Sequence, residues 1–500
     1  CDSVLLLPGF FIPLSAGMKA SFKKTYASLD ADRLVLLWLA VWWACNLLQA
    51  GLTELANDEA YYHMFAERLA WGYFDHPPVT ALLVWAGERL FGGELGVRFF
   101  FTVLQPLYLW ILWRLVRPAD ADRRDAALFT VVSASTLMLQ LYGFIAVPDG
   151  PLMLTAALFL LTFKRFTEGR RMAWLWMGVA MALMAYSKYH GALVVLFALA
   201  AAPPRQLLRP SLYLSGAVAL LLLVPHLVWQ YEHDWASFAY HLSGRNSVFR
   251  PGYVVEFLAN VLVVFNPFFV PLYVQAWRKV KPQTPVGRAL KLLPVAFIVF
   301  FVLSSLRGYV QPQWVIVSCF GLVYVLFAYA RRHPRTRRYV MRAGGVTVGL
   351  IVLVRLVMIF NPLGIRFEVF NNPESYAAIA AEAMLLVLLF GALGVLMVTG
   401  ITIAGRVPSE LIRMNYDSIA YAQEMVRAMN GIRFPELYRD TDTLGWEKRG
   451  VLTAAVPLNS ELTFYTRYGD YLGRISEYLT LLCVLYYIAY RVKRKNYLVK

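Results

Sequence analysis

The sequence predicts an all-α polytopic membrane protein. Of its 500 residues 59% are hydrophobic and only 16% are charged, and the mean hydropathy is positive. Apolar stretches of ~20 residues, the length that a helix needs to cross a bilayer, recur along the chain. Soluble domains carry more charge and lack such stretches, so these observations place the chain in the membrane class.

The formal net charge of +17 agrees with this class because of where the basic residues stand. Lys and Arg form short clusters between apolar stretches, as the positive-inside rule predicts for cytoplasmic loops. A nucleic-acid-binding protein would instead gather them on one face of a folded domain. The pattern therefore argues against a nucleic-acid partner and indicates membrane lipids as partners.

The first predicted span, 34–48, follows basic residues between positions 19 and 33, which places the N-terminus in the cytoplasm and the next loop outside. In that loop, 79–90 is short and interrupted by Glu88 and Arg89, which predicts an interfacial helix. Ten further spans follow with consistent sidedness. They are 97–116, 126–146, 152–163, 173–186, 191 to the basic linker 205–209, 212–229, a span with Pro267 and Pro271, 292–306, one ending in a basic loop at 331–342, and 346–360.

The C-terminal part breaks this consistency. The stretches 384–403 and 475–490 are each long enough to cross, but if both do, the basic cluster at 491–495 lies outside, against the positive-inside rule. We therefore divide the chain into a non-native leader at 1–17, a membrane core at 18–380, and an atypical, fused tail at 381–500 with one or two further hydrophobic segments.

A polar segment in the first outer loop, NDEAYYHMFAERLAWGYFDHPP, is where chemistry is expected. Asp58 and Glu59 head a helix-like stretch, and a carboxylate there can act as a general base on an acceptor hydroxyl or amine. The alternative is a capped interfacial helix, because Asn57 suits the N-cap and acids suit the first turn. The cap needs only Asn57, so the two acids favour a functional site.

Further acids are predicted on the same face. Asp75 and His76 end the polar segment in a turn that two prolines make rigid. The alternative is a simple helix exit with a solvated Asp, which the same sequence also fits. Asp149 stands between two prolines after the third predicted span, where the alternative is a plain turn. Their common side of the membrane favours a shared site.

Two cations are predicted on that outer face, where the positive-inside rule disfavours them. Lys188 and Arg307 each close an apolar span. A phosphate or diphosphate headgroup at the membrane boundary needs such partners, Arg as a fork and Lys as a point charge. The alternative is snorkelling of long side chains to the interface.

A divalent metal is the one cofactor that the composition leaves open. His76, His190, His233 and His241 lie on the predicted outer face, yet their spacing fits no recognised ligand pattern. The four cysteines are far apart, without a CxxC motif, and are interpreted as small buried hydrophobes. They are Cys1, Cys45, Cys319 and Cys483.

Four segments together resemble bacterial members of glycosyltransferase family 39, in the GT-C superfamily. They are NDEAYY with GYFDHPP, PDGPL, SKYHG and SLRGYVQPQW, and the resemblance covers about residues 30–380. Relatives in this superfamily include protein O-mannosyltransferases and the aminoarabinose transferases of lipid A. The resemblance implies a GT-C-like fold of about 11 to 13 transmembrane helices, with interfacial helices in the first outer loop.

The family also implies an activity, namely transfer of a sugar from a polyprenyl-phosphate donor to a lipid, glycan or protein acceptor at the periplasmic face of the bacterial inner membrane. By resemblance Asp58 is the catalytic base, Glu59 lies beside it, and Asp149 is a second catalytic acid. Lys188 and Arg307 stand where such enzymes hold the lipid phosphate. The same motifs supply further residues predicted to contact the substrates, which are Tyr62, Asp75, His76 and Tyr189.

Residues 462–490, with TFYTRYGDYLGR, resemble the C-terminal end of apolipoprotein N-acyltransferase. The Glu, Lys and Cys active-site segments of that enzyme have no match here, so the tail is assigned no acyltransferase activity. Two rival functions for the core stay open, a transporter or flippase of lipid-linked substrates and a non-catalytic assembly subunit. Clustering of the acids in one outer loop, away from mid-span, favours the enzyme.

Overall fold

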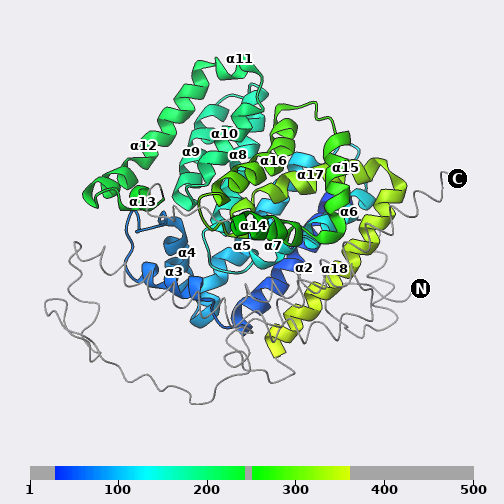
Figure 1. Cartoon of the computed structure of the whole chain (residues 1–500), viewed down its shortest axis with the longest axis horizontal. Helices are drawn as coiled ribbons and strands as arrows, with labels where there is room; N and C mark the ends of the chain where they lie inside the picture. The colour runs from blue at the N-terminus through cyan, green and yellow to red at the C-terminus, as the bar shows by residue number, and fades with distance from the viewer. Residues whose placement is uncertain (1–28, 242–250, 361–500) are drawn as a thin grey trace. The chain divides into compact units, whose positions relative to one another are not determined.

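The computed structural model describes residues 29–241 and 251–360, all within the first of the two units into which the chain divides, residues 1–388. Every regular element in these residues is a helix (Figure 1). The predicted all-α class is confirmed. The predicted leader, the tail with its two hydrophobic stretches, Cys1 and Cys483 lie outside the described residues.

Among residues 29–241 and 251–360, five helices are long and apolar enough to cross a membrane, and they make the chain a multi-pass membrane protein. Each overlaps a predicted span, and each begins before the predicted start, by 12 residues in α18 and by two to seven in the others. The five are α2 (Ala31–Leu52), α5 (Gly93–Val116), α12 (Pro210–Glu232), α16 (Pro285–Ser305) and α18 (Pro334–Phe360).

A sixth candidate span is sharply bent. Its two halves, Pro251–Leu262 and Pro267–Lys279, meet at 84°. They correspond to α14 (Pro251–Val264), followed by η2 (Pro267–Phe269) and α15 (Val270–Lys279). Asn266 stands at the bend with a φ of 80°, a conformation that Asn tolerates, and its side-chain oxygen accepts the N–H of Phe268. The prolines expected in this span therefore mark a change of direction.

The other predicted spans form shorter helices of 10 to 19 residues, so fewer full-length spans are described than the eleven expected. Helices surrounded by other helices are apolar all round whatever their length, which makes them look like spans in a hydropathy pattern. These shorter helices are α6 (Arg123–Ala134; 12 residues), α8 (Asp149–Thr167; 19), α9 (Ala173–Ser187; 15), α10 (Gly191–Ala200; 10) and α17 (Ser318–Arg332; 15).

The prediction of one continuous span over 126–146 is wrong. Helix α6 ends at Ala134, and a separate short helix, α7 (Leu137–Leu141), follows. Polar side chains satisfy the backbone at the break: the amide of Gln140 donates to the Ala134 carbonyl at 2.6 Å, and that of Asn266 donates to the Ser135 carbonyl at 2.9 Å. Because these groups replace helical hydrogen bonds, the chain can turn within the apolar interior.

The predicted basic loop at 331–342 is also wrong. Helix α17 ends at Arg332, and α18 begins at Pro334, so only His333 separates them. Proline is favourable in the first turn of a helix, where its missing N–H would have no partner. The basic residues after it therefore belong to the first turns of α18.

The loop between α2 and α5, predicted to be the first outer loop, contains two short helices, α3 (Asn57–Glu67) and α4 (Val79–Glu88). A helix is thus present in the predicted stretch 79–90, and its place at the membrane interface stays a prediction. Helices α3 and α4 pack on each other, and α4 packs on α5. His63 of α3 lies 2.7 Å from Glu88 of α4 through its Nε2 atom. The remaining short helices are α11 (Pro204–Leu207), α13 (Ala236–Ala239) and η3 (Pro312–Val315).

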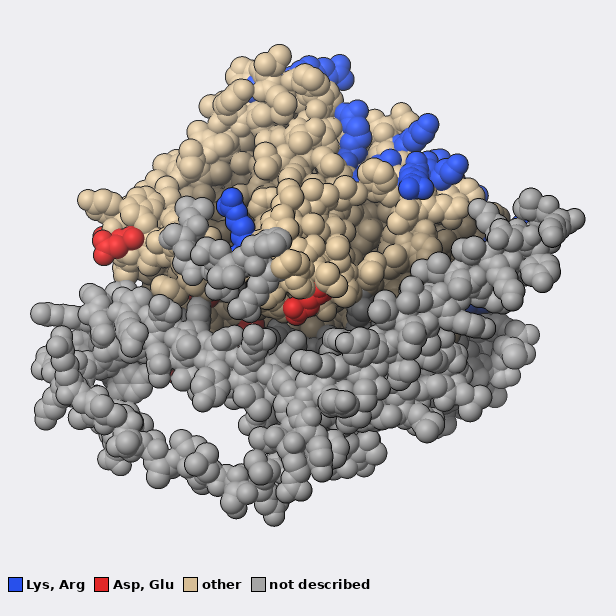
Figure 2. Space-filling view, viewed as in Figure 1, with Lys and Arg blue, Asp and Glu red and all other residues tan. Residues whose placement is uncertain are grey.

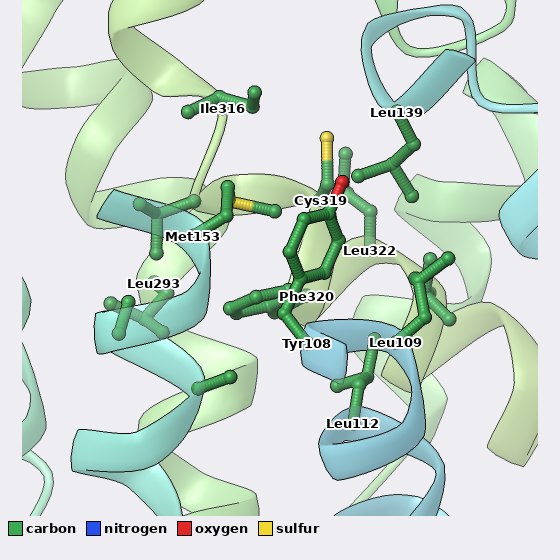
Figure 3. Close-up of a cluster of buried hydrophobic side chains, with 14 of the residues drawn as sticks. Tyr108, Leu109, Leu112, Leu139, Met153, Leu293, Ile316, Cys319, Phe320 and Leu322 are labelled. Carbon is green, nitrogen blue, oxygen red and sulfur yellow. The ribbon is translucent and has the colours of Figure 1, made fainter. Parts of the chain in front are cut away.

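The hydrophobic core lies where α5, α8, α16 and α17 meet (Figure 3). Tyr108 of α5 and Phe320 of α17 face each other with ring centroids 5.9 Å apart, and Met153 of α8 and Leu293 of α16 lie close by in the same view. All four are buried. Cys319 is fully buried in this core, as a small hydrophobe should be, whereas Cys45 of α2 is half-buried.

Basic and acidic side chains separate on the face drawn in Figure 2. The blue Lys and Arg side chains gather mainly toward the end where Figure 1 labels α11 and α15, and the few visible acids lie away from it. Helices α8, α9 and α12 lie side by side, as do α2 and α5. The start of α8 and the end of α9 therefore come together at the end of the bundle remote from α11.

Candidate active site

The paired acids of the first outer loop lie in the first turn of α3, but the expected cap is wrong. The N-cap is Ala56 in place of Asn57, and its N–H donates to Oε2 of Glu59 at 2.8 Å. The second acid therefore reaches back over the helix start, as in a capping box. Asp58 is not used in the cap.

Glu59 is fully buried in a bidentate ion pair with Arg98 of α5. Nε of Arg98 donates to Oε1 at 2.7 Å and Nη2 donates to Oε2 at 2.5 Å. The N–H of Ala146 also donates to Oε1, at 2.8 Å. Each Glu59 oxygen thus accepts two hydrogen bonds, which satisfies a buried carboxylate and leaves it no role as a proton acceptor.

Asp149 and Lys188 form a second buried ion pair. Asp149 is the first residue of α8, and Lys188 directly follows α9. Because these two helices are packed neighbours, Nζ of Lys188 reaches both carboxylate oxygens at 2.8 Å, with side chains 7% and 4% exposed. A buried charge of this kind is retained only with its partner, so the two residues act as a unit.

Asp58 is half-buried beside this ion pair. Burial, and next the negative charge of Asp75, raise its pKa to about 6, while the positive charge of Lys188 opposes the rise. Asp149 and Glu59 add smaller contributions of the same sign as Asp75. A carboxyl group that ionises just below neutral pH is suited to accept a proton from a substrate.

Asp75 and His76 lie together in the turn that ends the polar segment. Asp75 is buried and accepts the phenol O–H of Tyr61 at 3.0 Å, and its Oδ2 lies 3.5 Å from Nε2 of His76. The ring of Tyr62, also buried, packs edge-on against His76 with centroids 5.5 Å apart. Nε2 of His241 lies 2.8 Å from the Asp75 carbonyl oxygen.

Tyr189 joins the loop to α12 through a chain of polar contacts. Its phenol oxygen lies 3.2 Å from Nε2 of His226 and accepts from the Gln230 amide at 3.1 Å. The same amide donates to Ser237 at 2.7 Å, and the Ser237 hydroxyl donates to the Tyr73 carbonyl at 2.6 Å. The first outer loop is therefore held against the ends of α9, α12 and α13.

Arg307 stands apart from these contacts. It is exposed after the end of α16, and its guanidinium makes no hydrogen bond or ion pair within residues 29–241 and 251–360. His190 packs against Phe301 and Trp314, and His233 stacks on Trp229 at 4.1 Å. The predicted histidines thus occupy different environments, and no group of three or more His, Cys, Asp or Glu side chains forms a metal site in the described residues.

The comparisons with known proteins agree with this architecture. Residues 75–229 match the family model described as dolichyl-phosphate-mannose-protein mannosyltransferase. Lipid A galacturonosyltransferase RgtD of Rhizobium johnstonii is 22% identical over 337 residues, which are 63% of this chain and 69% of that protein. The chain also superposes on the crystal structure of ArnT from Cupriavidus metallidurans in the apo state, with a TM-score of 0.52, 20% identity, and coverage of 71% of this chain and 70% of that one. The same enzyme bound to undecaprenyl phosphate gives a TM-score of 0.53 at 19% identity, with the same coverage.

The chain is a membrane glycosyltransferase with the GT-C fold. The similarity to ArnT is the evidence for the fold, and the matches to the family model and to RgtD are the evidence for the enzyme class. The predicted resemblance of the core to this superfamily is confirmed. The family match itself spans the turn with Asp75, the ion pair of Asp149 and Lys188, and α12 up to Trp229.

The GT-C enzyme brings together most of the residues that the sequence singled out. Asp58 interacts electrostatically with Asp75 and with both members of the Asp149–Lys188 pair. Tyr62 packs on His76, and Tyr189 contacts His226 and His241 at the edge of the same loop. Their roles in catalysis and substrate binding remain predictions.

Sequence reasoning missed the polar residues that support this site. Arg98 and Arg355 stand in apolar segments, where an ionisable residue is by itself a signal of function. His226 and Gln230 lie one turn apart on α12, a spacing that places both on one face. The signals are present, but their partners cannot be named without the packing of the helices.

Proposed function

We propose that the enzyme moves a sugar from a polyprenyl-phosphate donor to a lipid, glycan or protein acceptor at the periplasmic face of the bacterial inner membrane. The observation that carries this proposal is a half-buried carboxyl, Asp58, with a pKa of about 6 beside the buried Asp149–Lys188 pair. The positive-inside rule supports the periplasmic side, because the acids follow the outer end of the first span.

The names of the relatives support the substrate classes. The family model is named for a dolichyl-phosphate-linked sugar, and ArnT was crystallised with undecaprenyl phosphate, so both names contain a polyprenyl phosphate. RgtD is named for lipid A. Among the three acceptor classes we therefore favour a lipid.

The chemical step assigns the proton to Asp58. Its carboxylate takes the proton of the acceptor hydroxyl or amine as that atom attacks the anomeric carbon of the sugar. The bond between that carbon and the phosphate oxygen breaks, and the polyprenyl phosphate leaves with the electron pair. No further reactant is needed, because the phosphate is a stable anion once cations surround it.

The lipid phosphate is assigned mainly to Arg307. Both predicted phosphate ligands are outer-face cations, but Lys188 already binds both oxygens of Asp149. The guanidinium of Arg307 is exposed and offers the planar fork that suits phosphate. In this proposal Lys188 contributes its charge to the site through the pair with Asp149.

The remaining predicted residues are assigned to orientation. Glu59 has no lone pair to spare, so we propose that it places Asp58 by fixing the start of α3. In this proposal Asp75 and His76 form one side of the site next to Asp58, and Tyr62 packs on His76. Tyr189, through Gln230 and Ser237, keeps this side of the site in contact with α12.

The test compares cells that express the intact chain, the Asp58→Asn form and a matched control, Glu94→Gln. Glu94 is an exposed acid in the first turn of α5, away from the site contacts. Mass spectrometry of lipids, glycans and envelope proteins is expected to show a sugar-sized mass addition with the intact chain and with Glu94→Gln, and a loss of about 10²- to 10⁴-fold with Asp58→Asn.

Each alternative has its own result. A full mass addition with Asp58→Asn would remove that residue as the base while leaving the transferase in place. No addition with any of the three inserted proteins, together with movement of a lipid-linked sugar across the membrane, would establish the rival transporter or flippase.

A further inference from the structure

The segment that joins α7 to α8, residues 142–148, leads directly into the ion pair of the proposed active site. It is irregular and buried, and Asp149 follows it as the first residue of α8. Irregular backbone at membrane depth is stable only where other groups satisfy its donors and acceptors. The side chains that do so fix the position of Asp149.

Amide side chains from α2 and α5 hold one part of this connection. Asn46 of α2 donates to the Gly143 carbonyl at 3.0 Å and to Oε1 of Gln105 at 2.6 Å. Gln105 of α5 donates in turn to the Leu139 carbonyl. A Cβ atom at Gly143 would overlap the amide group of Gln105, so glycine allows this approach without a shift of that side chain.

Arg355 of α18 binds the same cluster from the other side. Its Nη1 donates to Oδ1 of Asn46 at 2.9 Å, and its Nη2 donates to the backbone and side-chain oxygens of Gln140 at 2.8 and 3.0 Å. All these acceptors are neutral, and Arg355 has no carboxylate partner within the described residues. A half-buried cation without an anion is costly in an apolar segment, which argues that its position serves a purpose.

The ring of Phe144 lies between this arginine and the one that holds Glu59. The guanidinium carbon of Arg355 is 5.3 Å from the Phe144 centroid, and that of Arg98 is 5.7 Å from it. Two residues further on, the N–H of Ala146 donates to Glu59. Arg355 thus fixes the end of α7, just before the connection, and Glu59, the acid beside Asp58, fixes the later part of the connection.

We propose that Arg355 is a positioning residue for the transfer reaction, acting on Asp149 through residues 139–148, which are the end of α7 and the connection after it. It touches neither Asp58 nor the ion pair in any contact of the described residues. Its guanidinium binds α2 and the end of α7 at once, so it sets where the connection to α8 starts and hence how Asp149 and Lys188 face Asp58. The inference rests on the proposed function for its catalytic consequence, but the contacts themselves can be tested without activity.

The experiment uses the full chain in detergent with Arg355→Met, Arg355→Lys and a matched control, Arg342→Met, which removes an exposed arginine from the same helix. Hydrogen exchange measured by mass spectrometry reports on a peptide covering residues 139–150. Faster exchange of this peptide is expected for Arg355→Met and, to a smaller extent, for Arg355→Lys, because lysine cannot reach both acceptors at once. Arg342→Met should exchange like the parent.

The kinetic arm separates positioning from general loss of structure. For Arg355→Met we expect kcat to fall at least about tenfold with the KM for the donor changed less than about twofold, because a misplaced group slows the step without removing a substrate contact. Arg355→Lys should recover part of kcat. Unchanged exchange in the 139–150 peptide, or kcat equal to that of Arg342→Met in an active parent, would overturn the inference. If the parent chain is inactive but the variants show the expected exchange pattern, the proposed function is contradicted, whereas the structural contacts of Arg355 are supported.

Discussion

Asp58 differs from the acids around it in its electrostatic partners. Glu59 and Asp149 each bind a buried cation directly, whereas Asp58 belongs to neither ion pair. It therefore experiences burial and the repulsion of its neighbours with only partial compensation, and its pKa rises to about 6. A carboxyl group with this pKa suits a base at neutral pH.

This pKa predicts the pH dependence of transfer. A base must be ionised, and a raised pKa keeps Asp58 protonated to higher pH than an ordinary aspartic acid. At pH 5 only about a tenth of Asp58 is ionised, so log kcat/KM should rise with unit slope below pH 6 and level off above it. Rates measured from pH 4.5 to 8 check this, after the protein is shown to stay folded across the range.

A neighbouring acid supplies the control for that assignment. Asp75 is the second cause of the raised pKa, so Asp75→Asn should move the bend in the profile to lower pH, whatever it does to the maximal rate. A bend that stays in place in Asp75→Asn would assign it to another group. A parent profile that stays flat down to pH 4.5 would contradict the raised pKa of Asp58.

The ion pair of Asp149 and Lys188 allows stability and activity to be separated. Either Asp149→Leu or Lys188→Met leaves one buried charge unpaired and should cost about 3–5 kcal/mol of the free energy of unfolding. The double variant removes both charges and should recover most of that loss, while all three variants remain inactive. Thermal unfolding in detergent and transfer assays provide the two measurements. Transfer by the double variant would show that the pair is structural only.

At the scale of residues, the sequence predicts which side chains lie close together but not which of them form ion pairs. Asp58, Asp75, Asp149 and Lys188 were expected on one face, and the structure brings them together. The partner of Glu59 was not foreseen, because Arg98 is 39 positions away and the contact depends on how α3 docks on α5. Side-chain pairing of that kind is a property of three-dimensional packing, which periodicity does not contain.

At the scale of elements, the first outer loop docks on α12 next to the proposed site. Gly72 lies against the indole of Trp229, where an added Cβ would stand 2.4 Å from Cε3. His226 of the same helix contacts the Trp71 carbonyl through Nδ1 at 2.6 Å. The loop and α12 are thus fitted to each other beside Asp75 and Tyr189.

Substitution of this glycine is predicted to loosen the loop. Gly72→Ala forces the indole or the loop backbone to move and should cost about 1–3 kcal/mol of the free energy of unfolding, with a fall in transfer. Gly92→Ala is the matched control, because nothing lies within 4 Å of its Cβ position. Thermal unfolding and transfer rates are compared for the two. Equal effects would mean that the contact with Trp229 does not limit either property.

Helices were predictable where length, hydropathy and charge agree, as in α2, α5 and α12. The break between α6 and α7 was not, because residues 126–146 are apolar enough for one span and the break depends on the distant amide of Asn266. The boundary between α17 and α18 was mistaken for a loop, since arginine clusters mark the side of the membrane and not the backbone conformation.

At the scale of the whole molecule, the described residues contain a complete proposed site. Its acids and cations lie between Asp58 and Arg307, and the supporting contacts extend to Arg355. The GT-C fold and the multi-pass class were predictable because composition and a few motifs constrain them. We propose that residues 18–380 form the catalytic core and that 381–500 is an appended tail, which the sequence pattern alone suggests.

This division predicts the result of truncation. A chain that stops after residue 380 keeps α2 to α18 and should insert, unfold within ~2 °C of the full chain, and retain transfer. A chain that stops at residue 333 loses α18 and with it Arg355, so it should insert but lose most of its activity. Membrane fractionation, thermal unfolding and the transfer assay measure the three properties. Loss of insertion or of transfer in the longer truncation would make the tail an integral part of the enzyme, because that truncation differs from the full chain only by residues 381–500.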